Sequence, residues 1–427
     1  MTAEIAIMNS QAIALAADSA VTVGAEGESK VYNTANKLFM LSKYEPVGVM
    51  IFGDATFMGI PWEVIIKSYR DLLKKTRFNT IEEYANDFIE RLEKNSWFFA
   101  ETPQIDFIQE TAACYFMNIN ADIDEKVKQL LDDSIQLDAD GVKRLINRII
   151  EFNYNEVREK PLLQNFDSSD VQEIVTKYGK EIEEVVAAVF QKLPLSKASV
   201  KMLKEIAGFL VCNTMFHSAT SGIVIAGFGE RDFFPKLVSY DIMGAIKNRL
   251  KYRQIHSSAI SFERRAAVIP FAQIEMVSTF MDGVDPFYSR AIDGWLSGIL
   301  DFLPEAIVGS LDKLSEKEKE KLTKKAKSVS RAILDDAQKS LSELQKLYSN
   351  PVTSAVALLP KEELALMAES LVNLTSLKRR VSMEAETVGG AVDVAVISKG
   401  DGFIWMKRKH YFEPKYNNHF FCNYYRE

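Results

Sequence analysis

The stretch that decides the fold is TAEIAIMNSQAIALAADSA, residues 2–20. It contains two short apolar runs, AEIAIM and AIALAA, on either side of Asn9 and Ser10, a pair that favours turns. We predict a β-hairpin from this pattern. The hairpin would start beside Thr2 and end beside Asp18, so two polar residues would lie together at its open end.

The register of this hairpin follows from placing its large apolar side chains on one face. That register sets Thr2 opposite Asp18, and small residues on the other face would leave room beside them. The expected pairs are Ile5 with Leu15 and Ile7 with Ile13, and the expected small residues are Ala6, Ala14 and Ala16.

Further strands and helices are readable along the chain. KVYNTANKLFML (30–41) and VGVMIF (47–52) form a predicted strand pair, and the helix PWEVIIKSYRDLLKK (61–75) opens at Pro61. Two later hairpins are expected, and their strands are SGIVIAGFG (221–229) with PKLVSYDI (235–242), and AVDVAVIS (391–398) with GFIWMKRK (402–409).

Long amphipathic stretches interrupt these strands. IEEYANDFIERLEK and EVVAAVFQKLP have helical periodicity, and LSEKEKEKLTKKAKSVSRAILDDAQKSLSELQKLY predicts one charged helix or a helical pair with a solvated face. We expect a single sheet-centred domain over residues 1–427. Its parts would be core segments 1–80, 216–300 and 351–410, helical insertions 81–215 and 301–350, and an aromatic tail 411–427 that docks on the body or on a neighbouring subunit.

Composition limits the class of protein. The 427 residues are 47% hydrophobic and 26% charged, and the net charge of −7 comes from mixed residues, which argues against nucleic acid as a partner. No signal peptide or membrane-spanning run is apparent, and the three cysteines lack the paired spacing of a zinc or redox site. We expect a cytoplasmic protein without membrane partner, metal or cofactor.

The start of the chain could carry its own chemistry. If Met1 is removed, the free α-amine of Thr2 has an ordinary pKa near 8, so it can accept the hydroxyl proton of the same residue. Such a nucleophile also needs a cation, a carboxylate that holds the cation, and a backbone donor for the oxyanion. The candidates are Lys37, Asp18 and Gly53, whose N–H can approach a substrate closely because the residue has no side chain.

The same residues resemble a known family. TAEIAIMNSQAIALAADSA is similar to the start of mature catalytic β subunits of proteasomes and of the bacterial proteasome-like peptidase, which are N-terminal-nucleophile (Ntn) hydrolases. ANKLF resembles the segment with the family lysine, VMIFGDA the oxyanion loop, and ETVGGAVDVAVISKGDGF the last strands. The resemblance implies an α/β fold, a four-layer α/β/β/α sandwich with antiparallel sheets, here enlarged by helical insertions. It also implies Thr2 as nucleophile, Asp18 and Lys37 as its charge pair, and Gly53 as oxyanion donor.

Two family positions are less clear in this chain. The family has a serine and an aspartate that support the terminal threonine, and here the matching turn reads SMEAETVGG. We place Glu386 in the role of the aspartate, with Glu384 as a close alternative. The serine region, MVSTFMDGVDP, offers Ser278, Asp282 and Asp285.

The expected function is therefore threonine-dependent hydrolysis of amide bonds in peptides or proteins, by a homo-oligomer. The pattern leaves open an ATPase partner. Two alternatives share the fold: a noncatalytic proteasome-like scaffold that binds partners through its inserted helices, and a small-molecule amidase at the same site.

Overall fold

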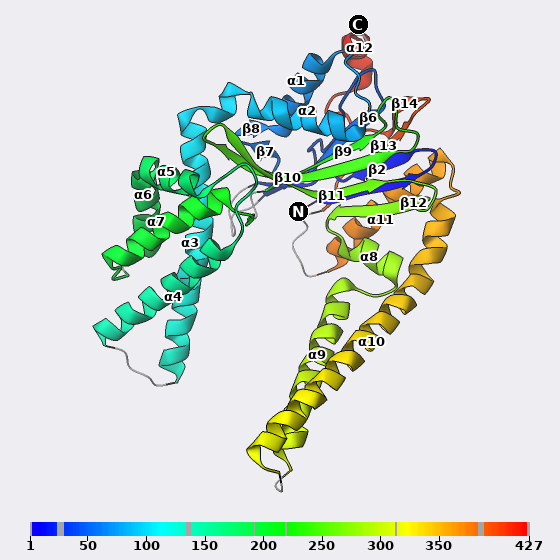
Figure 1. Ribbon diagram of the computed structural model, residues 1–427. Coiled ribbons are helices and arrows are strands. Elements are labelled where there is room, and N and C mark those ends of the chain that lie inside the picture. Colours follow the sequence, from blue (N-terminus) through cyan, green and yellow to red (C-terminus); the bar gives the residue numbers. More distant parts are fainter. Residues whose placement is uncertain are drawn as a thin grey trace. The chain divides into compact units, whose positions relative to one another are not determined.

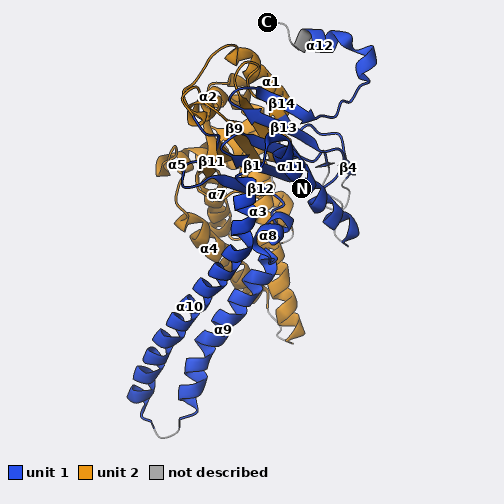
Figure 2. Cartoon of the chain, turned by 90° about the vertical axis from the view of Figure 1, so that its right-hand side faces the viewer, with its two compact units in different colours: residues 1–38, 233–236, 259–427 blue, residues 39–232, 237–258 orange. Residues whose placement is uncertain are grey.

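The chain folds into two compact units (Figure 2). Unit 1 comprises residues 1–38, 233–236 and 259–427, and unit 2 comprises residues 39–232 and 237–258. The computed structural model describes residues 2–23, 30–133, 138–191, 193–217, 220–311, 314–382 and 388–424. Each unit combines an antiparallel sheet with helices, so the chain is a mixed α/β protein.

The sheet of unit 1 has five strands in the order β12-β1-β2-β13-β14, and all neighbours are antiparallel. The N-terminal hairpin occupies two of its inner positions, so both of its strands are paired on both sides. The bounds are β1 (Ala3–Asn9), β2 (Ile13–Ala17), β12 (Ala266–Ala272), β13 (Asp393–Ser398) and β14 (Gly402–Lys407). A separate two-stranded ribbon joins β3 (Val21–Val23) and β4 (Lys30–Tyr32).

The register of the N-terminal hairpin differs from the expected one by one residue. Ile5 pairs with Ala16 and Ile7 with Ala14, not with Leu15 and Ile13. The expected register would leave Ser10 as the only residue between paired partners, whereas the observed one gives the two-residue connection that hairpins favour. The backbone N–H of Asn9 donates to the carbonyl oxygen of Ala12 at 3.0 Å across this turn.

The one-residue shift also changes which side chains share a face. The first face now combines large residues from β1 with small residues from β2, and the second face carries large residues from both strands. The first face, with Ile5, Ile7, Ala14 and Ala16, packs against α11 (Lys361–Val381) in a common core with Val394 and Val396. The second face carries Glu4, Ala6, Met8, Ile13 and Leu15, and it is buried as well. The expected all-alanine face is therefore wrong.

The remaining helices of unit 1 follow strand β12. They are α8 (Glu275–Asp282), α9 (Pro286–Gly309), α10 (Glu316–Val356) and α11, and the tail ends in η2 (Pro414–Tyr416) and α12 (Asn418–Tyr424). Helices α9 and α10 contact each other along a hairpin that projects from the sheet of unit 1 (Figure 2). The projecting pair begins at Pro286, earlier than the insertion boundary at residue 301 that the sequence suggests.

Unit 2 is built on a second five-stranded sheet with the order β11-β10-β9-β6-β5. Its strands are β5 (Leu38–Met40), β6 (Val47–Gly53), β9 (Ser221–Gly227), β10 (Lys236–Ile246) and β11 (Arg249–Ala259), with a small ribbon of β7 (Thr56–Phe57) and β8 (Ile60–Pro61). Leu38 is the last residue of unit 1 before the chain enters unit 2. The expected single strand over 30–41 is thus two short strands, β4 and β5, with irregular backbone between them.

The helices of unit 2 belong to two cores. Helix α1 (Trp62–Leu73) and helix α2 (Ile81–Glu93) pack on the sheet around Trp62 and Phe88. The other helices of unit 2 lie together as a group (Figure 1). They form a second core that includes Phe107 and Ile150. They are α3 (Glu101–Asp132), α4 (Ala139–Glu159), α5 (Ser168–Lys177), α6 (Gly179–Phe190) and α7 (Lys197–Cys212), whereas η1 (Ser96–Phe99) contributes Phe98 to the core of the sheet. Although α2 lies in the predicted insertion, it shares the core of the sheet.

Candidate active site

Thr2, Asp18 and Lys37 meet at the open end of the N-terminal hairpin in unit 1. The ammonium of Lys37 donates one hydrogen bond to Thr2 Oγ1 at 2.9 Å and one to Asp18 Oδ1 at 2.6 Å. All three residues are buried, with exposed fractions of 4%, 1% and 6% for Thr2, Asp18 and Lys37. Because water is largely excluded, the charges of this pair are weakly screened and act strongly on the threonine hydroxyl.

Asp18 is held by backbone donors on both carboxylate oxygens. Its Oδ1 accepts from the N–H of Ala3 at 3.1 Å, and its Oδ2 accepts from Gly389 at 2.9 Å and Ala20 at 3.3 Å. These bonds tie the start of β1 and the loop before β13 to one side chain. The carboxylate can therefore orient Lys37 without moving itself, which is what electrostatic preorganisation requires.

Lys37 reaches the site from irregular backbone and not from a strand. It directly precedes β5 and follows a segment anchored by the N–H of Ala35, which donates to the carbonyl of Ser19 at 3.0 Å. The hydroxyl of Ser19 in turn donates to the carbonyl of Ala391. The expected strand at Lys37 is thus wrong, although the residue lies beside Asp18 and Thr2.

Gly53 lies in unit 2 at the end of β6, where its φ of +78° is in the left-handed region. A Cβ at this position would lie 2.2 Å from the carbonyl oxygen of Thr220, so only glycine fits the backbone there. The local backbone therefore explains why residue 53 is a glycine. The oxyanion role of Gly53 stays a prediction.

The sequence also suggested residues that would support the terminal threonine. Glu384 and Glu386 fall outside the described residues. Ser278 and Asp282 lie in α8, and Asp285 caps α9 by accepting from the N–H groups of Phe287 and Tyr288.

Among the described residues, no hydrogen bond joins any of these candidates to Thr2 or Lys37. Burial raises the pKa of Asp282, and the backbone N–H donors lower the pKa of Asp285. Of the residues that the sequence suggested, the described hydrogen bonds therefore join Thr2, Asp18 and Lys37.

One residue of the site was not singled out from the sequence. Glu4 lies on β1, two positions after Thr2, and is 2% exposed. Burial raises the pKa of its carboxyl group well above the ordinary value, the charge of Lys37 opposes this increase, and the charge of Asp18 adds to it. The sequence shows Glu4 only as a carboxylate inside an apolar run. Such a residue is also found on strands with one exposed face, so the sequence did not indicate that Glu4 is buried.

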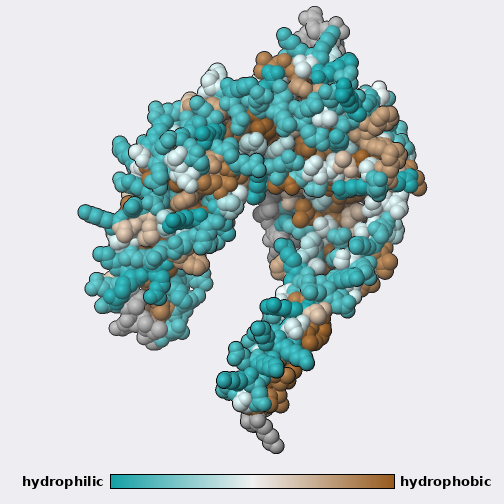
Figure 3. All heavy atoms as spheres, in the orientation of Figure 1, coloured by the Kyte–Doolittle hydropathy of each residue, from teal (hydrophilic) through white to brown (hydrophobic). Residues whose placement is uncertain are grey.

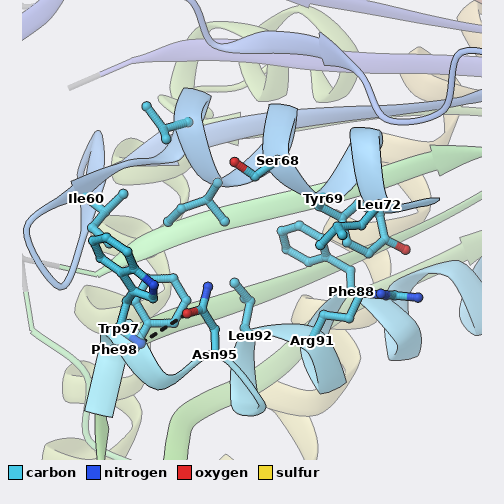
Figure 4. Close-up of a pocket in the computed structure, with 12 residues that line it drawn as sticks. Ile60, Ser68, Tyr69, Leu72, Phe88, Arg91, Leu92, Asn95, Trp97 and Phe98 are labelled. Carbon is cyan, nitrogen blue, oxygen red and sulfur yellow. Dashed lines mark hydrogen bonds between the residues drawn. The ribbon is translucent and has the colours of Figure 1, made fainter. Parts of the chain in front are cut away.

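A separate pocket of about 390 Å³ lies in unit 2, next to helices α1 and α2. Figure 4 shows Tyr69, Leu72 and Arg91 along it, with Trp97 and Phe98 of η1 at its other end. The Tyr69 hydroxyl donates to Asp87 at 2.8 Å, and Arg91 donates to the same carboxylate at 2.8 Å. The pocket is mostly apolar and contains none of the proposed catalytic residues.

No protein-family model fits the chain, and no curated protein matches it. In the described part of the chain, no helix is both long and apolar enough to cross a bilayer. The same residues contain no group of three His, Cys, Asp or Glu side chains that could hold a metal ion. The assignment of a function therefore depends on the geometry around Thr2.

Proposed function

We propose that the protein is a threonine-dependent amide hydrolase of the N-terminal-nucleophile type, active once Met1 has been removed. One observation carries the proposal: the buried ammonium of Lys37 donates to both Thr2 Oγ1 and Asp18 Oδ1. A fixed cation at 2.9 Å from a hydroxyl oxygen favours the alkoxide character that the oxygen needs as a nucleophile.

The reaction would proceed through an ester on Thr2. The hydroxyl oxygen adds to the scissile carbonyl carbon, its proton passes to the α-amine of Thr2, and the carbonyl electron pair moves onto oxygen. The intermediate then expels the leaving amine, which takes that proton. Water activated by the same α-amine hydrolyses the ester, releases the acid and restores the hydroxyl.

The remaining parts of the expected site are assigned by resemblance. We propose that Gly53 donates its N–H to the oxyanion and that Glu386 supports the α-amine of Thr2. In this proposal the two sheets stack as the inner layers of an α/β/β/α sandwich. Two five-stranded antiparallel sheets, each with helices packed on it, support that arrangement.

The substrate would be a peptide or an unfolded protein, and the working form a homo-oligomer in the cytoplasm. An enclosed assembly would keep folded proteins away from a reactive threonine. An ATPase partner would fit such an assembly, and a small amide would be the substrate if the chain acts as a single subunit.

A second function is favoured by the surface of the projecting hairpin. Helices α9 and α10 expose large apolar side chains, and Figure 3 shows hydrophobic residues along this hairpin. Examples are Trp295, Phe302, Ile333 and Leu347, which are 69%, 66%, 52% and 69% exposed. Exposed apolar patches of this kind mark protein-interaction sites. A noncatalytic scaffold that binds partners through α9 and α10 is therefore the alternative.

Kinetics of Thr2 variants separate these functions. A protein with its N-terminus verified at Thr2 should hydrolyse members of a peptide panel, and Thr2→Ala should fold equally well but lose the activity. Thr2→Ser should retain part of it, because hydroxyl and amine both remain. Lys37→Ala should lose about a hundredfold or more in rate, the scale for one electrostatic partner. Equal rates for the wild type and Thr2→Ala, or no rate for either, would overturn the enzymatic proposal.

A further inference from the structure

Glu4 is a buried carboxyl group on β1, an inner strand of the unit 1 sheet. Neither of its carboxyl oxygens has a hydrogen-bond partner among the described residues. Its cross-strand neighbours are Ala17 on β2 and Phe271 on β12, neither of which has a donor side chain. An unpaired buried carboxyl group is costly, whereas an apolar residue would be favourable at this position.

The position of Glu4 connects it to the Thr2 site. Thr2 directly precedes β1 and continues its pairing with β12, because its carbonyl oxygen accepts from the N–H of Gln273 at 3.2 Å. Side chains two positions apart along such extended backbone share a face, so Glu4 projects on the same side as Thr2. The charges of Lys37 and Asp18 are the two that act on the pKa of its carboxyl group, after the larger effect of burial. The net effect is a strong increase in the pKa, which favours the neutral acid form of Glu4.

Lys37 has a donor that complements this acid. An ammonium group has three N–H donors, and within the described residues Lys37 uses two of them, toward Thr2 and Asp18. A neutral carboxylic acid can accept a hydrogen bond through its carbonyl oxygen without forming a second ion pair. It would therefore fix the third N–H while Asp18 remains the only counter-ion.

We propose that Glu4 is a positioning residue: one water accepts the third N–H of Lys37 and donates to the carbonyl oxygen of Glu4, and this bridge keeps the ammonium directed at Thr2 Oγ1. An ionised Glu4 would compete with Asp18 for the ammonium and draw its charge away from the hydroxyl. The neutral acid avoids this competition. Its part in catalysis rests on the proposed function, whereas its link to Lys37 does not.

Infrared spectroscopy tests the link without any reaction. The protonated carboxyl band of Glu4 should appear in the difference spectrum between wild type and Glu4→Gln. The difference between Lys37→Met and Lys37→Met/Glu4→Gln isolates the same band in the absence of the Lys37 charge. That band should persist to a higher pH than in the wild type, because the Lys37 charge lowers the pKa of Glu4. Asp170→Asn is a matched control, because it also removes a buried carboxylate. Burial raises the pKa of Asp170, but Lys247 and Arg249 outweigh this effect and hold the pKa below its ordinary value. That variant should leave the band unchanged.

Reaction kinetics test the positioning role. The probe is a peptide epoxyketone, whose ketone carbon is attacked by the Thr2 hydroxyl and whose epoxide is opened by the α-amine. Glu4→Leu should lower the maximal rate of adduct formation about ten- to a hundredfold, as expected for one hydrogen bond to a charged group. The half-saturating concentration should stay unchanged. Glu4→Gln, which retains an acceptor oxygen, should recover most of the rate.

The two experiments give separable results. A band that is absent, or that titrates at the same pH in wild type and Lys37→Met, overturns the proposal for Glu4. A wild-type rate in a folded Glu4→Leu protein overturns its positioning role. If the wild type itself forms no adduct, the proposed function fails. The infrared result then still supports or overturns the link between Glu4 and Lys37.

Discussion

Asp18→Asn removes one charge from the buried pair and nearly preserves the side-chain shape. Asp18 and Lys37 are 1% and 6% exposed, so the variant leaves an ammonium buried without its counter-ion. Loss of one partner from such a pair costs about 3–5 kcal/mol. Both carboxylate oxygens of Asp18 accept hydrogen bonds from backbone N–H groups. The amide nitrogen introduced by Asp18→Asn would replace one of these acceptors with a donor, so a backbone N–H would lose its hydrogen bond. We therefore expect a loss of about 4 kcal/mol or more in the free energy of unfolding.

Hydrogen exchange of the β1 and β2 amides in increasing urea measures this loss within unit 1. Lys37→Met and the double variant complete a thermodynamic cycle, in which we expect a favourable coupling of about 2–3 kcal/mol. Glu305→Gln is the control, because the pair of Glu305 with Lys327 is exposed and should contribute less than about 1 kcal/mol. A loss below about 1 kcal/mol in Asp18→Asn, or additive single variants, would refute the buried ion pair.

Three further outcomes follow from other parts of the chain. Burial lowers the pKa of Lys251 to about 7, so above that pH the unfolded chain binds one proton more than the native one. Stability should then rise by about 1.4 kcal/mol per pH unit toward the unfolded-state pKa. Urea unfolding of Lys251→Met at pH 7 to 9 should lack this slope, and an unchanged slope would contradict the burial. Gly53→Ala should lose about 1–3 kcal/mol in thermal unfolding through backbone strain and the contact with Thr220. Gly59→Ala should lose less, since its φ is +79° but no atom lies within 4 Å of an added Cβ; equal losses would argue against the contact. Light scattering should find a homo-oligomer, and a strict monomer would favour the scaffold or the small-molecule amidase.

The N-terminal hairpin illustrates how far the sequence leads. Alternating apolar runs around Asn9 and Ser10 were enough to predict its two strands and to bring Thr2 near Asp18. The register was wrong because both faces are buried, so the rule that large residues share one face does not apply. Turn length was the better guide, since a two-residue connection requires Asn9 to pair with Ala12.

Side chains that depend on tertiary contacts were harder to place. Lys37 was expected on a strand, but it lies in irregular backbone that hydrogen bonds near Ser19 hold in place. Glu4 was overlooked because its burial results from pairing with β12 and β2, and β12 lies more than 260 residues further along the chain. The amphipathic helices were predictable from local periodicity. Their distribution between two cores in unit 2 was not, because α2 and α3 both have apolar faces.

The central claim is that Thr2, with a free α-amine, is the nucleophile. Mass spectrometry of the protein from its native host, before and after treatment with a peptide epoxyketone, tests this claim most directly. We expect an intact mass without Met1 and, after treatment, one adduct on the N-terminal peptide through both the hydroxyl and the amine of Thr2. A retained Met1, or an adduct absent from Thr2 when the N-terminus is free, would contradict it.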